Sequence, residues 1–370
     1  MQLPLALNSL LPLGGFVSSV LGGSQSCPPL PAGDLTLKQY QLYPVNFMWD
    51  KQRCVAYVSS LYNATVSVYD PYKSEITDVM WFPGLSHEGH SAINPLHASG
   101  LILRPDAATA DTLEIVIDNG DCFFTNGLNV SGPDYLLTMD LKTKNVTSQV
   151  RLNDISNGTY AGYAEAELAD DGNTYVVGTH VSNLLRVTPQ GEVSTFYVHP
   201  ELGPPRPYGF TGLAHVKDAI ITNDNVIGQL IRFDTRDEVG TPVVIPQTPY
   251  HGFTMSYVMN VPERYHGTIL LETENTSPEH VWGGVGVYRS QNGRFEEVEY
   301  LGFIPNPLEN TLATSAREMT DRIYVVALYT DGANITVSGH SSEFIFKDIT
   351  SDVDELVAKA SQAQSASSEL

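Results

Sequence analysis

The sequence predicts an all-β protein folded as a six-bladed β-propeller, and three observations support this prediction. First, a turn-flanked apolar strand recurs at intervals of 60, 60, 45, 49 and 54 residues, with markers at Val55, Ile115, Tyr175, Ile220, Ile269 and Ile323. Second, each repeat holds several short strands joined by turns, which is the content of a propeller blade. Third, 42% of the 370 residues are hydrophobic and only 17% are charged, which favours an ordered globule over a disordered chain.

The first 23 residues predict a secretory signal peptide. The segment is apolar, has no ionisable side chain, and is interrupted by Pro4 and Pro12, which disfavours a membrane-spanning helix. A buried or disordered leader is the alternative. Six N-x-S/T sequons indicate the same compartment, at Asn63, Asn129, Asn145, Asn157, Asn275 and Asn334. We expect a glycoprotein of the secretory pathway, secreted or vesicular, with no membrane insertion after signal removal.

Three cysteines permit at most one internal disulfide. The pair Cys27 and Cys54 is preferred, because Cys27 directly follows the predicted signal. Three buried thiols, Cys122 among them, are the alternative.

The charge balance restricts the partners. Lys and Arg total 20 against 42 Asp and Glu, a formal net charge of −22. So acidic a surface repels phosphate backbones and anionic lipid heads. We therefore expect small apolar organic substrates and no nucleic acid.

The propeller is expected to span residues 35–350. Residues 35–43 supply an outer strand for the last blade, which would close the ring and hide two open sheet edges. The second and fifth repeats carry longer loops, residues 119–135 and 274–286, expected on one rim, where propellers usually place binding sites. Residues 351–370 are rich in Ser and Ala and are expected to form a flexible tail, either a frayed helix or a disordered segment.

Candidate site residues come from the blade entrances, where six innermost strands converge on the central channel. The titratable candidates for proton transfer are His97, Glu165, His251 and Arg317, with His87 and His90 as further donors. The candidate pocket walls are Phe47, Trp49, Phe210, Phe253, Met255 and Tyr257. The alternatives are a structural ion pair between Glu165 and Arg317, a His97 that satisfies strand-end backbone groups, and aromatic side chains that form inter-blade core.

No metal or cofactor is predicted. His87-Glu88-Gly89-His90 lacks the spacing of H-E-x-x-H and is better interpreted as a hydrogen-bonded loop. The segment from Asp118 to Asp121 is better interpreted as a turn than as a cation site.

Two segments, "AEAELADDGNTYVVGTH" and "FTGLAHVKDAIITNDNVIGQLIRFD", resemble blades of the gluconolactonase and regucalcin superfamily, and this likeness covers most of residues 40–345. That family holds a divalent cation on channel asparagines and acidic residues and hydrolyses lactones. Here Ala164 and Thr211 stand at two of the asparagine positions, with Ser99 at the equivalent place in the second blade. A methyl group removes a ligand that a hard cation requires. A metal-dependent lactonase or esterase that uses Glu165, Asn223 or Asp224 is therefore the alternative function.

The whole chain, with "GLSHEGHSAINPLHASGL" and "DNGDCFF", resembles fungal propellers encoded in secondary-metabolite clusters. Among these are hetero-Diels–Alderases of tropolone-sesquiterpenoid pathways and a trichothecene-cluster propeller. The resemblance implies a cofactor-free, non-redox cyclase that dehydrates a tropolone alcohol to a quinone methide and joins it to a humulene-type sesquiterpene. Enforced proximity can supply about 7–11 kcal/mol of such a barrier, so neither nucleophile nor metal is required. A non-catalytic propeller that binds a ligand or a protein is the third possibility.

Overall fold

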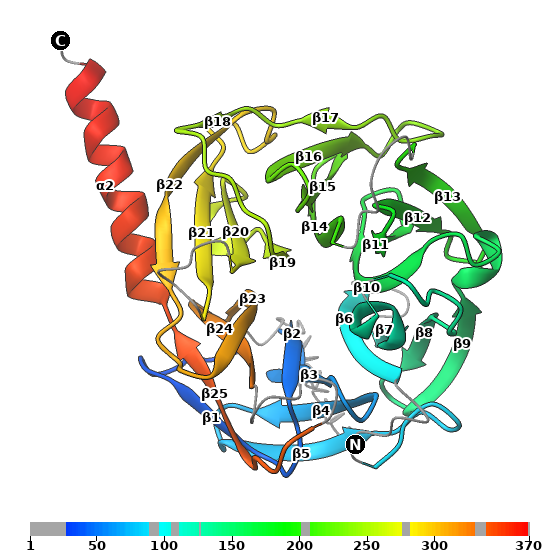
Figure 1. The fold of residues 1–370 in the computed structure, drawn as a ribbon. Coiled ribbons are helices and arrows are strands. Elements are labelled where there is room, and N and C mark those ends of the chain that lie inside the picture. The colour runs from blue at the N-terminus through cyan, green and yellow to red at the C-terminus, as the bar shows by residue number, and fades with distance from the viewer. Residues whose placement is uncertain are drawn as a thin grey trace, which may run out of the picture.

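The computed structural model describes residues 27–88, 96–104, 111–125, 127–200, 208–275, 282–329 and 338–368. Six sheets stand in a ring around a central axis (Figure 1), so the predicted six-bladed propeller is confirmed. Each of the six sequence markers lies on the second strand of its blade. The apolar repeat therefore counted the blades correctly. The predicted signal peptide lies outside the described residues.

The first three blades are continuous in sequence. Blade 1 contains β2 (Pro44–Asp50), β3 (Val55–Ser60), β4 (Thr65–Asp70) and β5 (Glu75–Met80). Blade 2 contains β6 (Leu96–Arg104), β7 (Thr112–Asn119), β8 (Tyr135–Asp140) and β9 (Asn145–Arg151), with the short helices α1 (Asp121–Phe124) and η1 (Asn153–Ile155) in its connections. Blade 3 contains β10 (Ala161–Leu168), β11 (Thr174–His180), β12 (Asn183–Val187) and β13 (Val193–Val198).

The last three blades include the additions and the closure. Blade 4 contains β14 (Phe210–Val216), β15 (Ala219–Asp224), β16 (Gln229–Asp234) and β17 (Val243–Val244). Blade 5 contains β19 (Ser256–Asn260), β20 (Ile269–Glu274), β21 (Gly284–Arg289) and β22 (Val298–Pro305), with β18 (Gln247–Thr248) parallel to β22 and η2 (Glu263–Tyr265) after β19. Blade 6 contains β23 (Thr311–Met319), β24 (Arg322–Tyr329), β25 (Glu343–Asp348) and β1 (Leu35–Lys38).

The ring is closed by the amino-terminal strand, as expected. Strand β1 pairs antiparallel with β25, so that Leu35 faces Phe346 and Leu37 faces Phe344. The four side chains join one buried cluster between blades 6 and 1. The predicted disulfide between Cys27 and Cys54 is present and ties the segment before β1 to the β2–β3 turn, while Cys122 is free and buried.

The core of the described residues lies between the blades. A cluster of buried apolar side chains fills each interface between neighbouring blades, in ring order from blades 6 and 1 around to blades 5 and 6. A blade sheet cannot bury both faces alone, and stacking on two neighbours provides the missing cover. The apolar contacts that stabilise the fold are therefore distributed around the ring between the blades. The blade residues that face the central axis are left to form a site.

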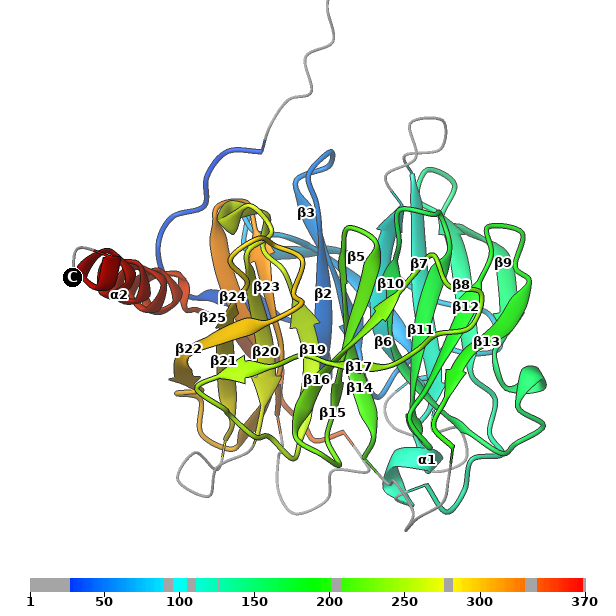
Figure 2. The same ribbon diagram turned by 90° about the horizontal axis from the view of Figure 1, so that it is seen from above.

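The part of the tail that the structure describes, where a frayed helix or disorder was expected, forms α2 (Thr350–Ser368), which lies outside the disc beside β22 (Figure 2). The helix is held because Val353 and Leu356 join the apolar cluster between blades 5 and 6. Asp354 also accepts hydrogen bonds from Arg264 and Tyr265. Across the described segments, none of the helices combines the length and apolarity needed to cross a membrane.

Candidate functional site

A repeated backbone irregularity builds a cavity at one end of the channel. In all six blades, the register between the first and second strands shifts once near the start of the first strand. Such bulges re-aim side chains and are frequent next to active sites. Residues left unpaired by the six shifts converge on one cavity of about 100 Å³: Val45, Ser99, Ala164, Thr211, Tyr257, Val258 and Thr314. We call it the mouth cavity.

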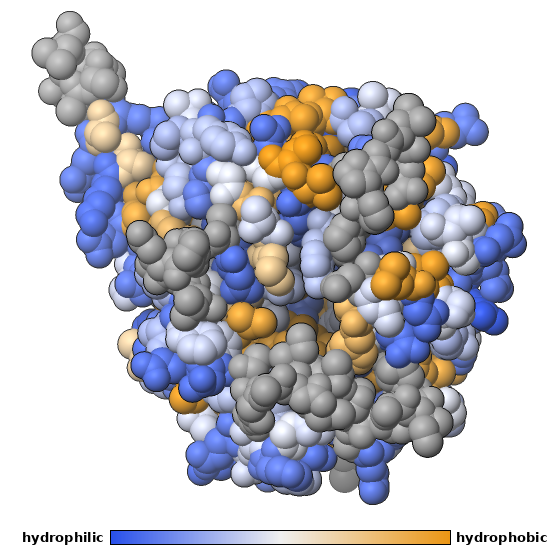
Figure 3. Space-filling model, in the orientation of Figure 1, coloured by the Kyte–Doolittle hydropathy of each residue, from blue (hydrophilic) through white to orange (hydrophobic). Residues whose placement is uncertain are grey.

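The other lining residues include one acid, Glu165, together with aromatic and uncharged polar side chains. Asn46, Glu165 and Thr179 come from the blades, Phe123 comes from α1, and Tyr208 precedes β14. Figure 3 views this face of the molecule, with apolar side chains exposed over β15 and β16, where Val226 and Ile227 form the turn. The cavity therefore suits an apolar molecule that presents one polar group to its floor.

Glu165 of blade 3 lies in the channel between residues of blades 1, 2 and 6. Its Oε2 accepts a hydrogen bond from Asn46 Nδ2 at 2.7 Å, and its Oε1 accepts one from the Ala166 amide at 3.1 Å. Arg317 Nη2 lies 3.6 Å from Oε1. On the other side, a Cβ placed on Gly100 would come within 3.0 Å of Oε1, so blade 2 approaches the carboxyl closely only because Gly100 has no side chain. Glu165 is 1% exposed.

Burial shifts the ionisation of the Glu165 carboxyl group toward neutral pH. Removal from water disfavours its charged form and raises the pKa of Glu165 from 4.5 to about 7, although the Arg317 guanidinium opposes the rise. The same causes, with Glu165 as a further negative neighbour, raise the pKa of Glu167 to about 8. Perturbed acids in a cavity are frequent at catalytic sites, and a pKa near the working pH is optimal for proton transfer.

Asn46 joins blades 1, 3 and 6 across the channel. Its Oδ1 accepts from the Phe47 amide at 2.8 Å, Ser315 Oγ at 2.8 Å and Arg317 Nε at 2.9 Å. Three donors on Oδ1 leave Nδ2 to donate to Glu165. Asn46 was not among the predicted site residues, because its role is revealed only by the convergence of three blades.

The predicted proton-transfer residues separate into two groups. Glu165 and Arg317 meet in the channel, as described above. His97 is buried on β6 with Nδ1 3.2 Å from Asp118 Oδ1, and its ring packs against Phe124 of α1, behind the cavity. His251 bonds Glu274 and lies in the connection between β18 and β19, away from the cavity lining. His90 lies outside the described residues, and His87 Nε2 is 3.4 Å from the Leu96 carbonyl.

Of the predicted walls, the structure places Tyr257 in the mouth cavity. Phe47, Phe210 and Phe253 lie in the apolar clusters between blades, where the alternative interpretation put them. Met255 directly precedes β19 and is 36% exposed. Trp49 lines a different cavity, at the other end of the channel. Phe123 and Tyr208 were not predicted, because they lie outside the blade strands, on α1 and before β14.

The three channel positions assigned by likeness to gluconolactonases, Ser99, Ala164 and Thr211, do line the mouth cavity. None of the three offers a carboxylate or amide oxygen. Across the described residues, no group of three or more His, Cys, Asp or Glu side chains is arranged to hold a metal ion. The donor set of the described channel therefore does not fit the cation of a lactonase.

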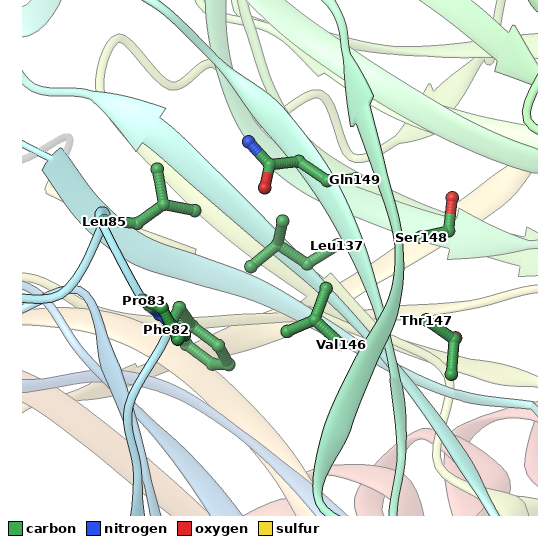
Figure 4. Close-up of a pocket in the computed structure, with 8 residues that line it drawn as sticks. All are labelled: Phe82, Pro83, Leu85, Leu137, Val146, Thr147, Ser148 and Gln149. Atoms are coloured by element: carbon green, nitrogen blue, oxygen red, sulfur yellow. The ribbon is translucent and has the colours of Figure 1, made fainter.

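A larger cavity of about 310 Å³ lies at the perimeter of the disc (Figure 4). Phe82 and Leu85 approach from the loop after β5, and Leu137 and Val146 from β8 and β9. Its lining residues include no titratable side chain, so it offers binding area without chemistry. The mouth cavity is the better candidate site.

Comparison with known proteins identifies the family. No family model matches the chain. The chain is 70% identical over 363 residues to "Trichothecene biosynthesis protein 14" of Trichoderma arundinaceum, covering 97% of this chain and 100% of that protein. It is 64% identical over 337 residues to "Core trichothecene cluster (CTC) protein 14" of Fusarium sporotrichioides, covering 91% and 90%. The chain belongs to the trichothecene-cluster protein 14 family. The predicted resemblance to a trichothecene-cluster propeller is confirmed. The protein is a β-propeller of a secondary-metabolism family.

Two solved structures have the same fold as this chain at low sequence identity. The Malassezia sympodialis allergen Mala s 1 superposes with a TM-score of 0.71 at 19% identity, covering 86% of this chain and 96% of the allergen. A regucalcin from Agrobacterium tumefaciens gives a TM-score of 0.52 at 14% identity, covering 86% and 94%. At such identities the likeness establishes the propeller alone.

Proposed function

We propose that the protein is a cofactor-free, non-redox cyclase of terpenoid secondary metabolism, in which Glu165 donates a proton to a departing hydroxyl group of an apolar alcohol. The observation that carries the proposal is a buried carboxyl group with a pKa near 7 on the floor of a largely apolar cavity. Membership of a trichothecene-cluster family supports the substrate class.

The proposed step balances without a co-reactant. Protonated Glu165 transfers its proton to the substrate hydroxyl, the carbon–oxygen bond breaks, and water leaves. An oxygen or alkene of the same molecule then bonds to the electron-poor carbon. Where the attacking group is a hydroxyl, its proton returns to the Glu165 carboxylate. Where it is an alkene, the new cation loses a proton from a neighbouring carbon to the Glu165 carboxylate, and a double bond forms. The net change is ring closure with loss of water, and no atom is oxidised or reduced.

The surrounding residues support each part of this step. Arg317 and Asn46 stabilise the Glu165 carboxylate after it loses its proton. Phe123, Tyr208 and Tyr257 limit the access of water that would quench the cationic or quinone-methide carbon. His97 and His251 do not line the mouth cavity, and the proposal gives them no proton-transfer role.

The narrower version of the proposal is a hetero-Diels–Alderase that joins a tropolone quinone methide to a humulene-type sesquiterpene. Formation of the quinone methide would use the same acid. Pockets for drug-sized ligands measure roughly 300–1,000 Å³, whereas the mouth cavity measures about 100 Å³. Its size favours one substrate that closes on itself over two joined partners.

The test uses the purified full chain and two substrate sets. One is the tropolone alcohol with humulene, and the other is the mixture of oxygenated sesquiterpenoid alcohols that a producing strain accumulates after deletion of this gene. We expect a cyclised, dehydrated product from the second set, unaffected by a chelator. Glu165→Gln should slow it more than tenfold with little change in melting temperature. Product formation no faster than in buffer, with both sets, would leave a non-catalytic binding protein.

We also propose that the protein enters the secretory pathway. The disulfide between Cys27 and Cys54 supports an oxidising compartment. Asn145 and Asn157 are exposed sequons, whereas Asn63 is buried and both side-chain amide atoms of Asn275 are buried. Mass spectrometry of the native protein should find glycans at Asn145 or Asn157 and none at Asn63 or Asn275. A protein without any glycan would contradict this route.

A further inference from the structure

A second cavity lies at the opposite end of the channel. The first residues of β2, β19 and β23 line the mouth cavity, and later residues of the same strands line this one, which measures about 150 Å³. We call it the rear cavity. It lies at the ends of these strands that carry the β2–β3 and β23–β24 turns, whereas α1 lies at the mouth. Nothing in the proposed cyclisation uses it.

Three residues that line the rear cavity carry a buried polar atom with no hydrogen-bond partner within the described part of the chain. They are Trp49 Nε1, Arg317 Nη2 and Asn260 Oδ1. Trp49 is 7% exposed and Arg317 is 4% exposed. An unsatisfied buried donor or acceptor costs about 1–3 kcal/mol, and such groups normally have a partner. Two donors and one acceptor around a single small cavity are the pattern of a binding site.

The charged residues around the rear cavity are Lys51, Glu263, Arg317 and Glu318. Lys51 and Glu263 pair with each other, and Glu318 Oε2 accepts a hydrogen bond from the Arg264 amide at 3.3 Å. Arg317 Nη2 lies 3.6 Å from Glu165 Oε1, the Arg317 charge also acts on Glu167 of the same strand β10, and burial favours the neutral form of both carboxyl groups. A buried guanidinium that its carboxyl neighbours neutralise only in part is stabilised by a further anion.

We propose that the rear cavity binds a small hydroxycarboxylate, which accepts hydrogen bonds from the Arg317 guanidinium and the Trp49 indole and donates one from its hydroxyl to Asn260 Oδ1. A cavity of about 150 Å³ has room for a small organic anion. Glycolate, with its five heavy atoms, is a suitable probe. This inference does not depend on the proposed cyclase activity.

The test follows the indole N–H of Trp49 by NMR in full-length protein labelled with ¹⁵N-tryptophan. The chain has 3 Trp residues, so Trp81 and Trp282 serve as internal references. At constant ionic strength, sodium glycolate should shift the Trp49 signal saturably with a dissociation constant in about the millimolar range. Acetate lacks the hydroxyl and should bind several-fold more weakly. Methyl glycolate carries no charge and should leave the signal unmoved.

Two matched variants complete the experiment. Asn260→Asp places a negative charge beside the ligand and should abolish the glycolate shift. Asn145→Asp adds the same charge on exposed β9 and should leave the shift intact. A Trp49 signal that does not move with glycolate overturns the proposal, as water is then the partner of these groups. Equal shifts with methyl glycolate, or a full shift in Asn260→Asp, also overturn it.

Discussion

His251 Nε2 lies 2.8 Å from Glu274 Oε1 and 2.9 Å from Oε2, so the imidazole covers a carboxylate that is itself fully buried. The ring also stacks on Tyr300, with centroids 4.1 Å apart and planes 3° from parallel. The pair joins the connection before β19 to the second strand of blade 5. His251 thus has a structural partner on a buried strand.

His251→Ala should lower the free energy of unfolding by about 3 kcal/mol, because a hydrogen bond to a buried charged group contributes about 1.5–3 kcal/mol and the stacking adds to it. Denaturant titration of His251→Ala, Glu274→Gln and the double variant measures the coupling between the two. Unchanged stability with lost turnover would instead assign His251 a role in proton transfer.

Arg317→Met should move the ionisation of Glu165 to higher pH, because the guanidinium favours the carboxylate form. If protonated Glu165 is the acid, turnover is present below its pKa and falls as pH rises through about 7. In Arg317→Met this falling limb should lie at higher pH, and Arg317→Lys, which keeps a positive charge, should shift it less. A limb that stays in place or moves to lower pH would contradict the assignment of Glu165.

Glu272→Gln should stabilise the protein in mild alkali. Glu272 is fully buried, and burial followed by the nearby Glu274 raises the pKa of Glu272 well above its ordinary value, although the neighbouring Tyr288 side chain opposes the rise. Below about pH 4.5 the carboxyl is protonated whether the chain is folded or not, so the wild type carries no penalty. As pH rises further the unfolded chain ionises more readily, and the folded state loses stability.

The neutral amide of the Glu272→Gln variant removes this dependence. Its melting temperature should equal that of wild type near pH 4.5 and exceed it near pH 8. Glu165 also has a raised pKa, but it is common to both proteins and cancels in the difference. A variant less stable than wild type at both pH values would show that the carboxylate is needed in the folded state.

Phe47→Ala should destabilise the fold by about 3–5 kcal/mol, because Phe47 is fully buried in the cluster between blades 6 and 1 and its loss leaves a void. Tyr257→Phe, in the wall of the mouth cavity, removes only a hydroxyl and should cost less than about 1.5 kcal/mol. Thermal unfolding of the two variants makes the comparison. A stable Phe47→Ala protein with weakened substrate binding would return Phe47 to the pocket wall.

The fold was predictable because blade stacking depends on apolar strands that recur at regular intervals. Ile115 and Ile269 mark second strands whose side chains are buried whatever the local details. Closure by residues 35–43 followed from the need to cover two sheet edges. Composition left a frayed helix and disorder both open for the C-terminal tail, because docking of the helix depends on Val353 and Asp354 meeting blade 5 and its neighbours.

The site was predictable in part, since the blade entrances were located correctly but the directions of their side chains were not. Glu165 lies in the channel, and it was predicted there because it is a titratable residue at a blade entrance. Phe47 and Phe210 appeared equally suitable, yet register shifts beside them turn Val45 and Thr211 toward the axis and leave the aromatic rings between blades. A bulge changes which residues face the channel, and its position is not legible in a single sequence.

The pairing of β1 with β25 has a consequence for synthesis of the chain. Residues 35–38 are synthesised before the other described strands, and their partners at 343–348 are synthesised after them. Until residue 348 is made, the nascent chain exposes an unpaired strand edge and the sixth blade is incomplete. Truncation shortly before residue 343 therefore leaves an open arc prone to association with other chains rather than a slightly smaller disc.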